Sequence, residues 1–121
     1  MVRVMMKLVW TLALIATFAG AGIVSGSAAP SPVINIDASN WKFTPSTIQV
    51  HAGQPTTLHL ISTEGVHGIQ SEELGIPMTA ITGSAKTVVF TPEKTGKYVL
   101  HCAIMCGAGH ANMTLTINVV P

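Results

Sequence analysis

Apolar and polar residues alternate with a period of two along much of the chain after residue 32. The clearest case is residues 112–120, where every second residue from Met113 to Val119 is apolar. Because successive side chains of a β-strand point to opposite faces, this alternation predicts a strand with one buried face. Strands are also expected at residues 33–39, 47–51, 56–63, 78–82, 86–91 and 97–102.

Turn residues separate these predicted strands. Residues 52–55 read AGQP and residues 91–96 read TPEKTG, and both are rich in residues that favour turns. Residues 64–77 form a longer connection that contains His67. No helical period follows the first 29 residues. About seven or eight short strands in about ninety residues predict an all-β domain, an antiparallel sandwich or barrel.

The first 29 residues have a different pattern. Arg3 and Lys7 precede an uncharged, mostly apolar run at residues 8–24, and small residues fill positions 25–29. This order fits a cleaved export signal, and the run also reaches the lower limit for one membrane-spanning helix. We therefore expect a signal peptide or a single membrane anchor at residues 1–29, a linker at 30–32 and one domain at 33–121. Both alternatives place the domain outside the cytoplasm, at the outer face of the cytoplasmic membrane or in the periplasm.

The charge of the chain argues against one class of partner. The formal net charge is +1, but Arg3 and Lys7 belong to the predicted leader. Four lysines and five acidic residues remain, which gives the domain a net charge of −1. Nucleic-acid binding requires a concentrated basic face. We therefore expect no nucleic-acid partner.

Residues 102–113, between the last two predicted strands, carry the candidate chemistry. Cys102, Cys106, His110 and Met113 follow one another at spacings of four, four and three. Thiolate, imidazole and thioether groups form a soft ligand set, which favours copper over magnesium, calcium or manganese. The segment has no charged residue. A metal held there would lie under an apolar surface that a partner can approach closely.

The strand period also predicts how this loop is held. Cys102 has the same parity as Leu100, and Met113 has the parity of the core positions of the last strand. Both side chains are therefore expected to point inward from the ends of adjacent strands. Gly107 and Gly109 allow a tight loop, so that the donors can converge on one point.

The second cysteine changes the expected number of metal ions. A single blue-copper centre uses one Cys, two His and a weak axial Met, which leaves Cys106 unexplained. Two thiolates can bridge two copper ions, with an upstream imidazole completing the set, and a rigid pair of this kind suits electron transfer. The alternative is a disulfide, as is common in exported chains. A bridge between Cys102 and Cys106 would close only a small ring and stabilise the fold little.

These residues resemble a known family. The spacing C-x3-C-x3-H-x2-M, the upstream Val66-His67-Gly68 and the lead-in Gly96-Lys97-Tyr98 are similar to the dinuclear copper A (CuA) domain of cytochrome c oxidase subunit II. The one-helix type of the B-family haem–copper oxidases is the most similar. Residues 40–45 (NWKFTP) and 48–53 (IQVHAG) also resemble the early strands of that domain. The resemblance covers residues 38 to 120 and implies a cupredoxin-like Greek-key β-sandwich or barrel.

The resemblance also implies a role for each donor. Cys102 and Cys106 would bridge two copper ions. His67 and Met113 would complete one ion, and His110 and the backbone carbonyl of Ile104 would complete the other. Many members with two membrane helices have a glutamate at the position of Ile104 that reaches a magnesium ion. Isoleucine cannot do so, and we expect no magnesium site.

The implied function is electron transfer within an oxidase. The protein would accept electrons from a cytochrome c or a small copper protein and pass them to haem in subunit I, and it would have no catalytic site of its own. A short linker and a possible cleavage site at residues 25–29 favour an alternative, a free-standing periplasmic copper protein for electron shuttling or copper handling. A zinc-stabilised or disulfide-stapled binding module is a third class.

The remaining candidate residues fit structural roles better. We expect surface positions for His51, His59 and His101, for Met105 in the loop, and for the pair Glu72 and Glu73. The alternatives are a partner contact for His101 and an extra ligand role for Met105. Trp41 is expected to pack in the core or at its rim, and a second role for an aromatic ring near the site is the uptake of electrons. No motif unites serine, histidine and aspartate into a nucleophile.

Overall fold

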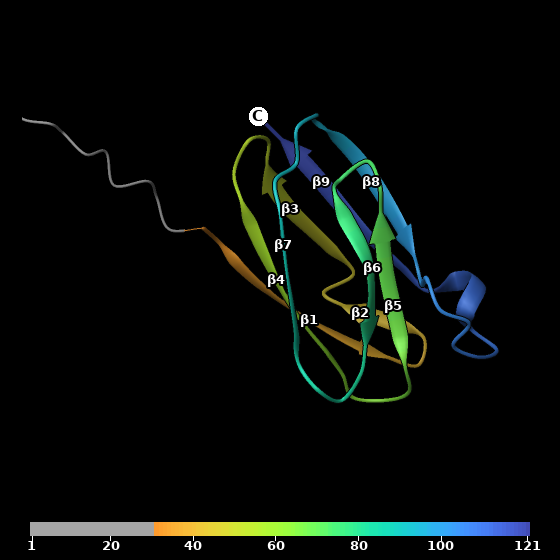
Figure 1. Ribbon diagram of the computed structural model, residues 1–121. Coiled ribbons are helices and arrows are strands. Elements are labelled where there is room, and N and C mark those ends of the chain that lie inside the picture. The colour runs from red at the N-terminus through yellow and green to blue at the C-terminus, as the bar shows by residue number, and fades with distance from the viewer. Residues whose placement is uncertain (1–30) are drawn as a thin grey trace, which may run out of the picture.

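The alternating residues form the strands of an all-β sandwich (Figure 1). The computed structural model describes residues 31–121, so the predicted leader helix lies outside the described residues. The strands are β1 (Val33–Ser39), β2 (Lys42–Thr44), β3 (Thr47–His51), β4 (Thr56–Ser62), β5 (His67–Ser71), β6 (Ile76–Ile81), β7 (Lys86–Phe90), β8 (Gly96–His101) and β9 (Thr114–Val120). One 3-10 turn, η1 (His110–Asn112), precedes β9. Residues 31–121 include no helix that is long and apolar enough to cross a membrane.

The strands form three sheets. One sheet has the order β2-β1-β4-β7, a second has the order β3-β9-β8, and β5 pairs with β6. Two pairings are parallel, β1 with β4 and β3 with β9. The expected antiparallel sandwich is therefore present as a sandwich, but these two pairs depart from the expected antiparallel pairing. A parallel pair needs a long crossover, and residues 40–55, which include β2 and β3, provide it between β1 and β4.

The core lies between the sheets and is built from the inward positions that the alternation predicts. Buried residues of both large sheets form one cluster. They include Ile36, Ala38, Ile48, Val50, Leu58, Leu60, Leu100, Leu115, Ile117 and Val119. The same cluster includes Cys102 and Met113 at one end of β8 and β9. The candidate ligands are therefore anchored in the core at two points.

Two parts of the secondary structure differ from the sequence-based expectation. Residues 64–77 were expected to be a connection, but they contain β5 and the start of β6. Three successive residues at the start of β5 are buried, so this strand has no alternating pattern to detect. Strand β2 has only three residues, too few to show a period. His67 consequently lies at the start of a buried strand and not in a loop.

Candidate metal centre

The loop from Cys102 to Met113 is closed at its base by the fold. The Cys102 amide donates a hydrogen bond to the Met113 carbonyl at 3.0 Å, which extends the ladder between β8 and β9. Cys102 is buried, and Met113 is fully buried. The inward direction predicted for both side chains is confirmed. Their sulfur atoms thus start from fixed positions in the core.

The second half of the loop brings two more donors to the same side. The Met113 amide donates to the carbonyl of His110 at 3.3 Å, across the turn η1. Side chains three residues apart in a 3-10 helix lie one above the other. Cys106 Sγ is 3.4 Å from His110 Nδ1 and 3.8 Å from Met113 Sδ. The thiol of Cys106 therefore lies between an imidazole and a thioether.

His67 reaches the site from β5. Its side chain is fully buried, and its Nδ1 is 3.9 Å from Cys102 Sγ. Its other ring nitrogen, Nε2, lies 2.6 Å from the carbonyl oxygen of Glu64. A carbonyl oxygen only accepts, so Nε2 carries the proton and Nδ1 keeps a lone pair. The lone pair faces the thiols, which is the orientation that a metal ligand requires.

Ile104 presents its backbone, and not its side chain, to the site. Its carbonyl oxygen accepts a hydrogen bond from the Cys102 thiol at 3.2 Å. Its side chain packs against β5, where a Cβ added to Gly68 would lie 2.9 Å from Ile104 Cγ1. The Ala103 amide also donates to the Gly68 carbonyl at 2.9 Å. These contacts hold the first turn of the loop beside His67.

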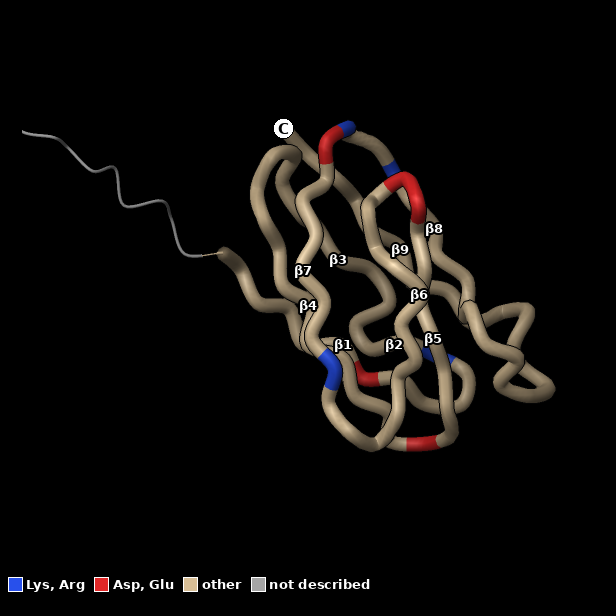
Figure 2. Tube along the Cα trace, in the orientation of Figure 1, with Lys and Arg blue, Asp and Glu red and all other residues tan. Residues whose placement is uncertain are grey.

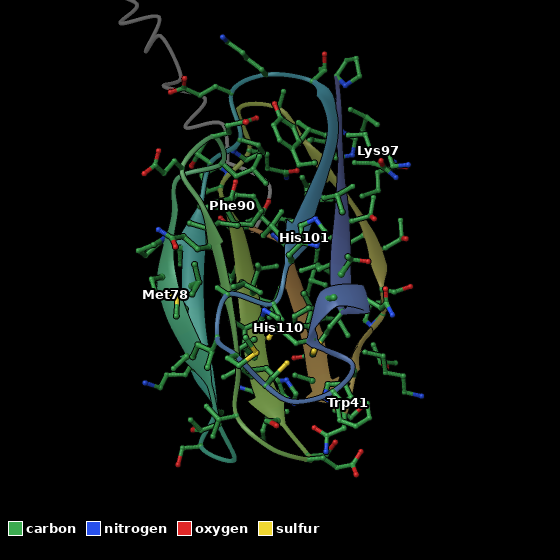
Figure 3. The ribbon with its side chains drawn as sticks, turned by 90° about the vertical axis from the view of Figure 1, so that its right-hand side faces the viewer. Trp41, Met78, Phe90, Lys97, His101 and His110 are labelled. Atoms are coloured by element: carbon green, nitrogen blue, oxygen red, sulfur yellow. The ribbon has the colours of Figure 1, made fainter. Side chains whose placement is uncertain are left out.

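The structure therefore brings all six predicted groups together. The donor atoms of His67, Cys102 and Cys106 lie within 4.8 Å of one another, and the other three each contact one of the thiols. Both thiols are free. Figure 3 shows the sulfur atoms gathered beside His110, and Figure 2 shows no charged residue on the loop. Two thiols, two imidazoles, a thioether and a carbonyl, without a carboxylate, form a donor set that fits copper.

The environment of Cys106 favours its protonated form before a metal binds. The pKa of the Cys106 thiol is raised from 9.0 to about 11. Burial is the largest cause, and the hydrogen bond and the charge of Cys102 raise the pKa further. A thiol binds metal as the thiolate. A metal ion must therefore displace the proton, and binding must release protons at neutral pH.

Three contributions to the site were not predicted from the sequence. They are the carbonyl of Glu64, the hydroxyl of Ser62 that holds the turn before His67, and a hydrogen bond from Trp41 Nε1 to the Cys106 carbonyl at 3.0 Å. Trp41 was expected in the core or at its rim, but it is 40% exposed and lies outside the buried cluster, with its ring against the loop at Gly107 and Gly109. The two glycines at positions 107 and 109 were the sequence signal for the Trp41 contact, because glycine allows another group to approach the backbone closely.

The other candidate residues are not part of the donor cluster. His51, His101 and Met105 are exposed and His59 is half-buried, so the expected surface positions of the first three are confirmed. Glu72 and Glu73 are exposed as well. His101 lines an open groove of about 590 Å³ between β5 and β8 that ends at Cys102. The two strands are joined at that end by the Ala103–Gly68 hydrogen bond.

Comparison with known proteins shows the family to which the chain belongs. The family of cupredoxin-like domains matches the chain over residues 5–117. In sequence, the chain is 32% identical over 77 residues to cytochrome c oxidase subunit 2 of Thermus thermophilus, which is 64% of this chain. The match spans 57% of that relative and 46% of a second subunit 2 sequence from the same species. The chain thus spans about half the length of the curated relatives it matches.

Solved structures share the fold. The periplasmic domain of cytochrome oxidase subunit II of Bradyrhizobium japonicum superposes with a TM-score of 0.66 at 17% identity, over 73% of this chain and 83% of that one. Auracyanin of Roseiflexus castenholzii superposes with a TM-score of 0.57 at 18% identity, over 78% of this chain and 100% of that one. The predicted cupredoxin-like sandwich is therefore confirmed, as is the resemblance to subunit II.

Proposed function

Because the chain belongs to the family of cupredoxin-like domains and has cytochrome c oxidase subunit 2 homologues, we propose that it transfers electrons through a dinuclear copper centre. The homology supports copper-based electron transfer in general. The proposal of two ions depends on one observation, the second thiol. Cys106 lies within reach of Cys102, His110 and Met113 and so occupies the middle of the donor set.

In this proposal, Cys102 and Cys106 would bridge both ions. His67 and Met113 would complete one ion, and His110 and the Ile104 carbonyl would complete the other. The contacts support this set because each terminal donor already lies against a thiol. His67 and the Ile104 carbonyl lie beside Cys102. His110 and Met113 lie beside Cys106.

The bound pair would supply the chemistry of accepting and releasing one electron. The protein residues supply a rigid set of donors, which keeps the rearrangement between oxidation states small. Cys102 and Met113 are fixed in the core by the β8–β9 ladder. His67 is fixed by its hydrogen bond to the Glu64 carbonyl. Three of the donors therefore lie at or beside strand ends, and the other three lie in the loop between β8 and β9.

Electron paramagnetic resonance of the copper-loaded domain tests the number of ions. A pair that shares one unpaired electron over two copper nuclei gives a seven-line hyperfine pattern, whereas a single copper gives four lines. We expect seven lines from the native chain and their loss in Cys106→Ser. Met105→Leu is the matched control, because Met105 is in the same loop, is 80% exposed and has no assigned role. Four lines from the native chain would refute the dinuclear proposal.

The partners follow from the same proposal. The domain would lie at the outer face of the cytoplasmic membrane, accept electrons from a cytochrome c or a small copper protein, and pass them to haem in oxidase subunit I. An uncleaved leader would attach it to the membrane. Since the match spans 57% of the first relative, this assignment extends beyond the matched region and needs its own test.

A free-standing periplasmic copper protein, for electron shuttling or copper handling, is the second candidate. The small residues at 25–29, which suit cleavage of the leader, favour it. N-terminal sequencing of the mature protein and co-purification with a haem-bearing membrane subunit separate the two. A mature chain that starts near residue 30 and purifies without haem supports the second candidate. An intact leader with bound haem subunit supports the first.

A further inference from the structure

We propose that Trp41 is a positioning residue that fixes the ligand loop from outside and so sets the place of Cys106. Trp41 lies in the turn between β1 and β2, in the other large sheet from β8 and β9. Its effect on bound copper rests on the proposed function, whereas its effect on the loop does not. In Figure 3 the labelled Trp41 lies beside the loop that contains His110.

The first observation is the hydrogen bond between Trp41 Nε1 and the Cys106 carbonyl, 3.0 Å long. It joins residues that are 65 positions apart. Within residues 31–121, no residue outside the loop other than Trp41 makes a hydrogen bond to the backbone of residues 105–109. The middle of the loop is therefore tied to the rest of the fold by this indole.

The second observation is that the loop backbone lies directly on the ring. A Cβ added at Gly107 would lie 3.0 Å from Trp41 Nε1, and one added at Gly109 would lie 2.5 Å from Trp41 Cδ2. Gly107 has a φ of +121°, which by itself favours glycine. Gly109 has an ordinary φ of −91°. The indole, and not the backbone conformation, therefore explains why glycine is needed at position 109.

The position of Cys106 follows from these contacts. Its carbonyl is held by the indole, and the loop that follows it packs on the ring. Its thiol then lies 3.4 Å from His110 Nδ1 and 3.8 Å from Met113 Sδ. Without the ring the backbone from Cys106 to Gly109 loses its one hydrogen bond from outside the loop among residues 31–121, and only the packing of Cys106 against the core still restrains these two distances.

The test uses the full chain, first without metal. Trp41→Phe removes the indole N–H, and Tyr98→Phe is the matched control because it also removes one bond from a side chain to a backbone carbonyl, 2.8 Å to Lys94, away from the donors. The rate at which iodoacetamide alkylates Cys106, located by mass spectrometry, should rise several-fold in Trp41→Phe and stay unchanged in Tyr98→Phe. Equal rates in all three proteins would overturn the proposal.

A double-mutant cycle tests the ring contact separately. Gly109→Ala should raise the unfolding constant about tenfold in the native background and leave it almost unchanged in Trp41→Ala, because the clash then has no partner. Equal effects in both backgrounds would overturn the contact. This outcome is independent of copper, so it is distinguishable from a failure of the proposed function.

Measurements on the copper-loaded variants test whether Trp41 affects the copper site itself and not only the stability of the fold. Trp41→Phe should change the copper hyperfine splitting and speed copper loss to a chelator, with Tyr98→Phe as the control. If the native chain binds no copper pair, the proposed function fails, while the alkylation and the cycle still decide the role of Trp41. If the pair forms with an identical spectrum and rate of loss in Trp41→Phe, the indole does not position Cys106.

Discussion

The two ring nitrogens of His67 have separate partners, and this separation gives the residue its role. The Glu64 carbonyl fixes the proton on Nε2, and the Nδ1 lone pair faces Cys102 Sγ at 3.9 Å. The positions of the Cys106 and Met113 side chains are likewise related, because their sulfur atoms lie 3.8 Å apart. At the scale of single residues, the site is therefore a set of donors whose directions are fixed before a metal arrives.

The raised pKa of Cys106 predicts how the stability of the metal-free domain depends on pH. The pKa of this thiol is about 11 in the fold and ordinarily 9.0. Between these values the unfolded chain has already lost the proton that the folded chain retains, so the unfolded state is favoured as pH rises. The contribution is fully present below pH 9 and is lost by about pH 11. Urea unfolding at several pH values should show this loss, and Cys106→Ser should reduce it.

Met113→Leu separates the ligand role of Met113 from its packing role. The side chain is fully buried, and leucine conserves most of its volume, so the loss of unfolding free energy should be below about 1.5 kcal/mol. The thioether donor is lost, so the copper spectrum should change while the fold remains. A native spectrum in the folded variant would show that Met113 is only a core residue.

At the scale of elements, the turn between β4 and β5 aims His67. Ser62 is buried at the end of β4, and its hydroxyl lies 2.9 Å from the Glu64 carbonyl and 2.6 Å from the Gly65 carbonyl. The same Glu64 carbonyl accepts a hydrogen bond from His67 Nε2. The turn is therefore held on one side by a serine and on the other by the candidate ligand.

Ser62→Ala tests this turn. Loss of the buried hydroxyl should cost about 1 kcal/mol of unfolding free energy. Because the Glu64 carbonyl is then less restrained, the Nε2 proton of His67 should exchange faster with solvent in NMR spectra. Ser84→Ala, at an exposed serine of the β6–β7 turn, is the control. Unchanged exchange in Ser62→Ala would show that the serine does not help to orient His67.

How much was predictable also differs between elements. Alternation was enough to predict β9, β3 and the inward direction of Cys102 and Met113, because one face of each strand meets the core and the other meets solvent. It failed for β5, where His67 and the two residues after it are all buried. The hydrogen bond from Trp41 to Cys106 spans 65 positions. Such a contact depends on how the sheets pack, which no local pattern specifies.

At the scale of the whole molecule, charge is distributed away from the candidate centre. The loop has no charged residue. The nearest charged residues in the neighbouring turns have opposite signs: Lys42 follows Trp41, and Glu64 lies in the turn before His67. Figure 2 shows the other charged residues in turns and strand ends outside the loop. The surface over the donors is therefore nearly neutral, and long-range steering of a charged partner should be weak.

The predicted consequence is that the rate at which the bound copper is reduced depends little on salt concentration. Reduction of the copper-loaded domain by the cation hexaammineruthenium(II) should change less than about twofold between low and physiological salt. Met105→Glu adds a negative charge at an exposed position of the loop. This variant should react faster at low salt and lose the gain as salt screens the charge. A strong salt dependence in the native domain would contradict the neutral surface.

The central position of β9 in its sheet also determines when, during folding, the ligand loop can close. Strand β9 lies between β3 and β8, and it pairs Ile117 with Ile48 from the first part of the domain. Pairings between distant segments form slowly. Until β9 is inserted, nothing closes the loop at Cys102 and Met113. A newly made chain therefore has to finish folding before it can present a complete set of donors, and maturation of the proposed centre begins only after synthesis has passed residue 120.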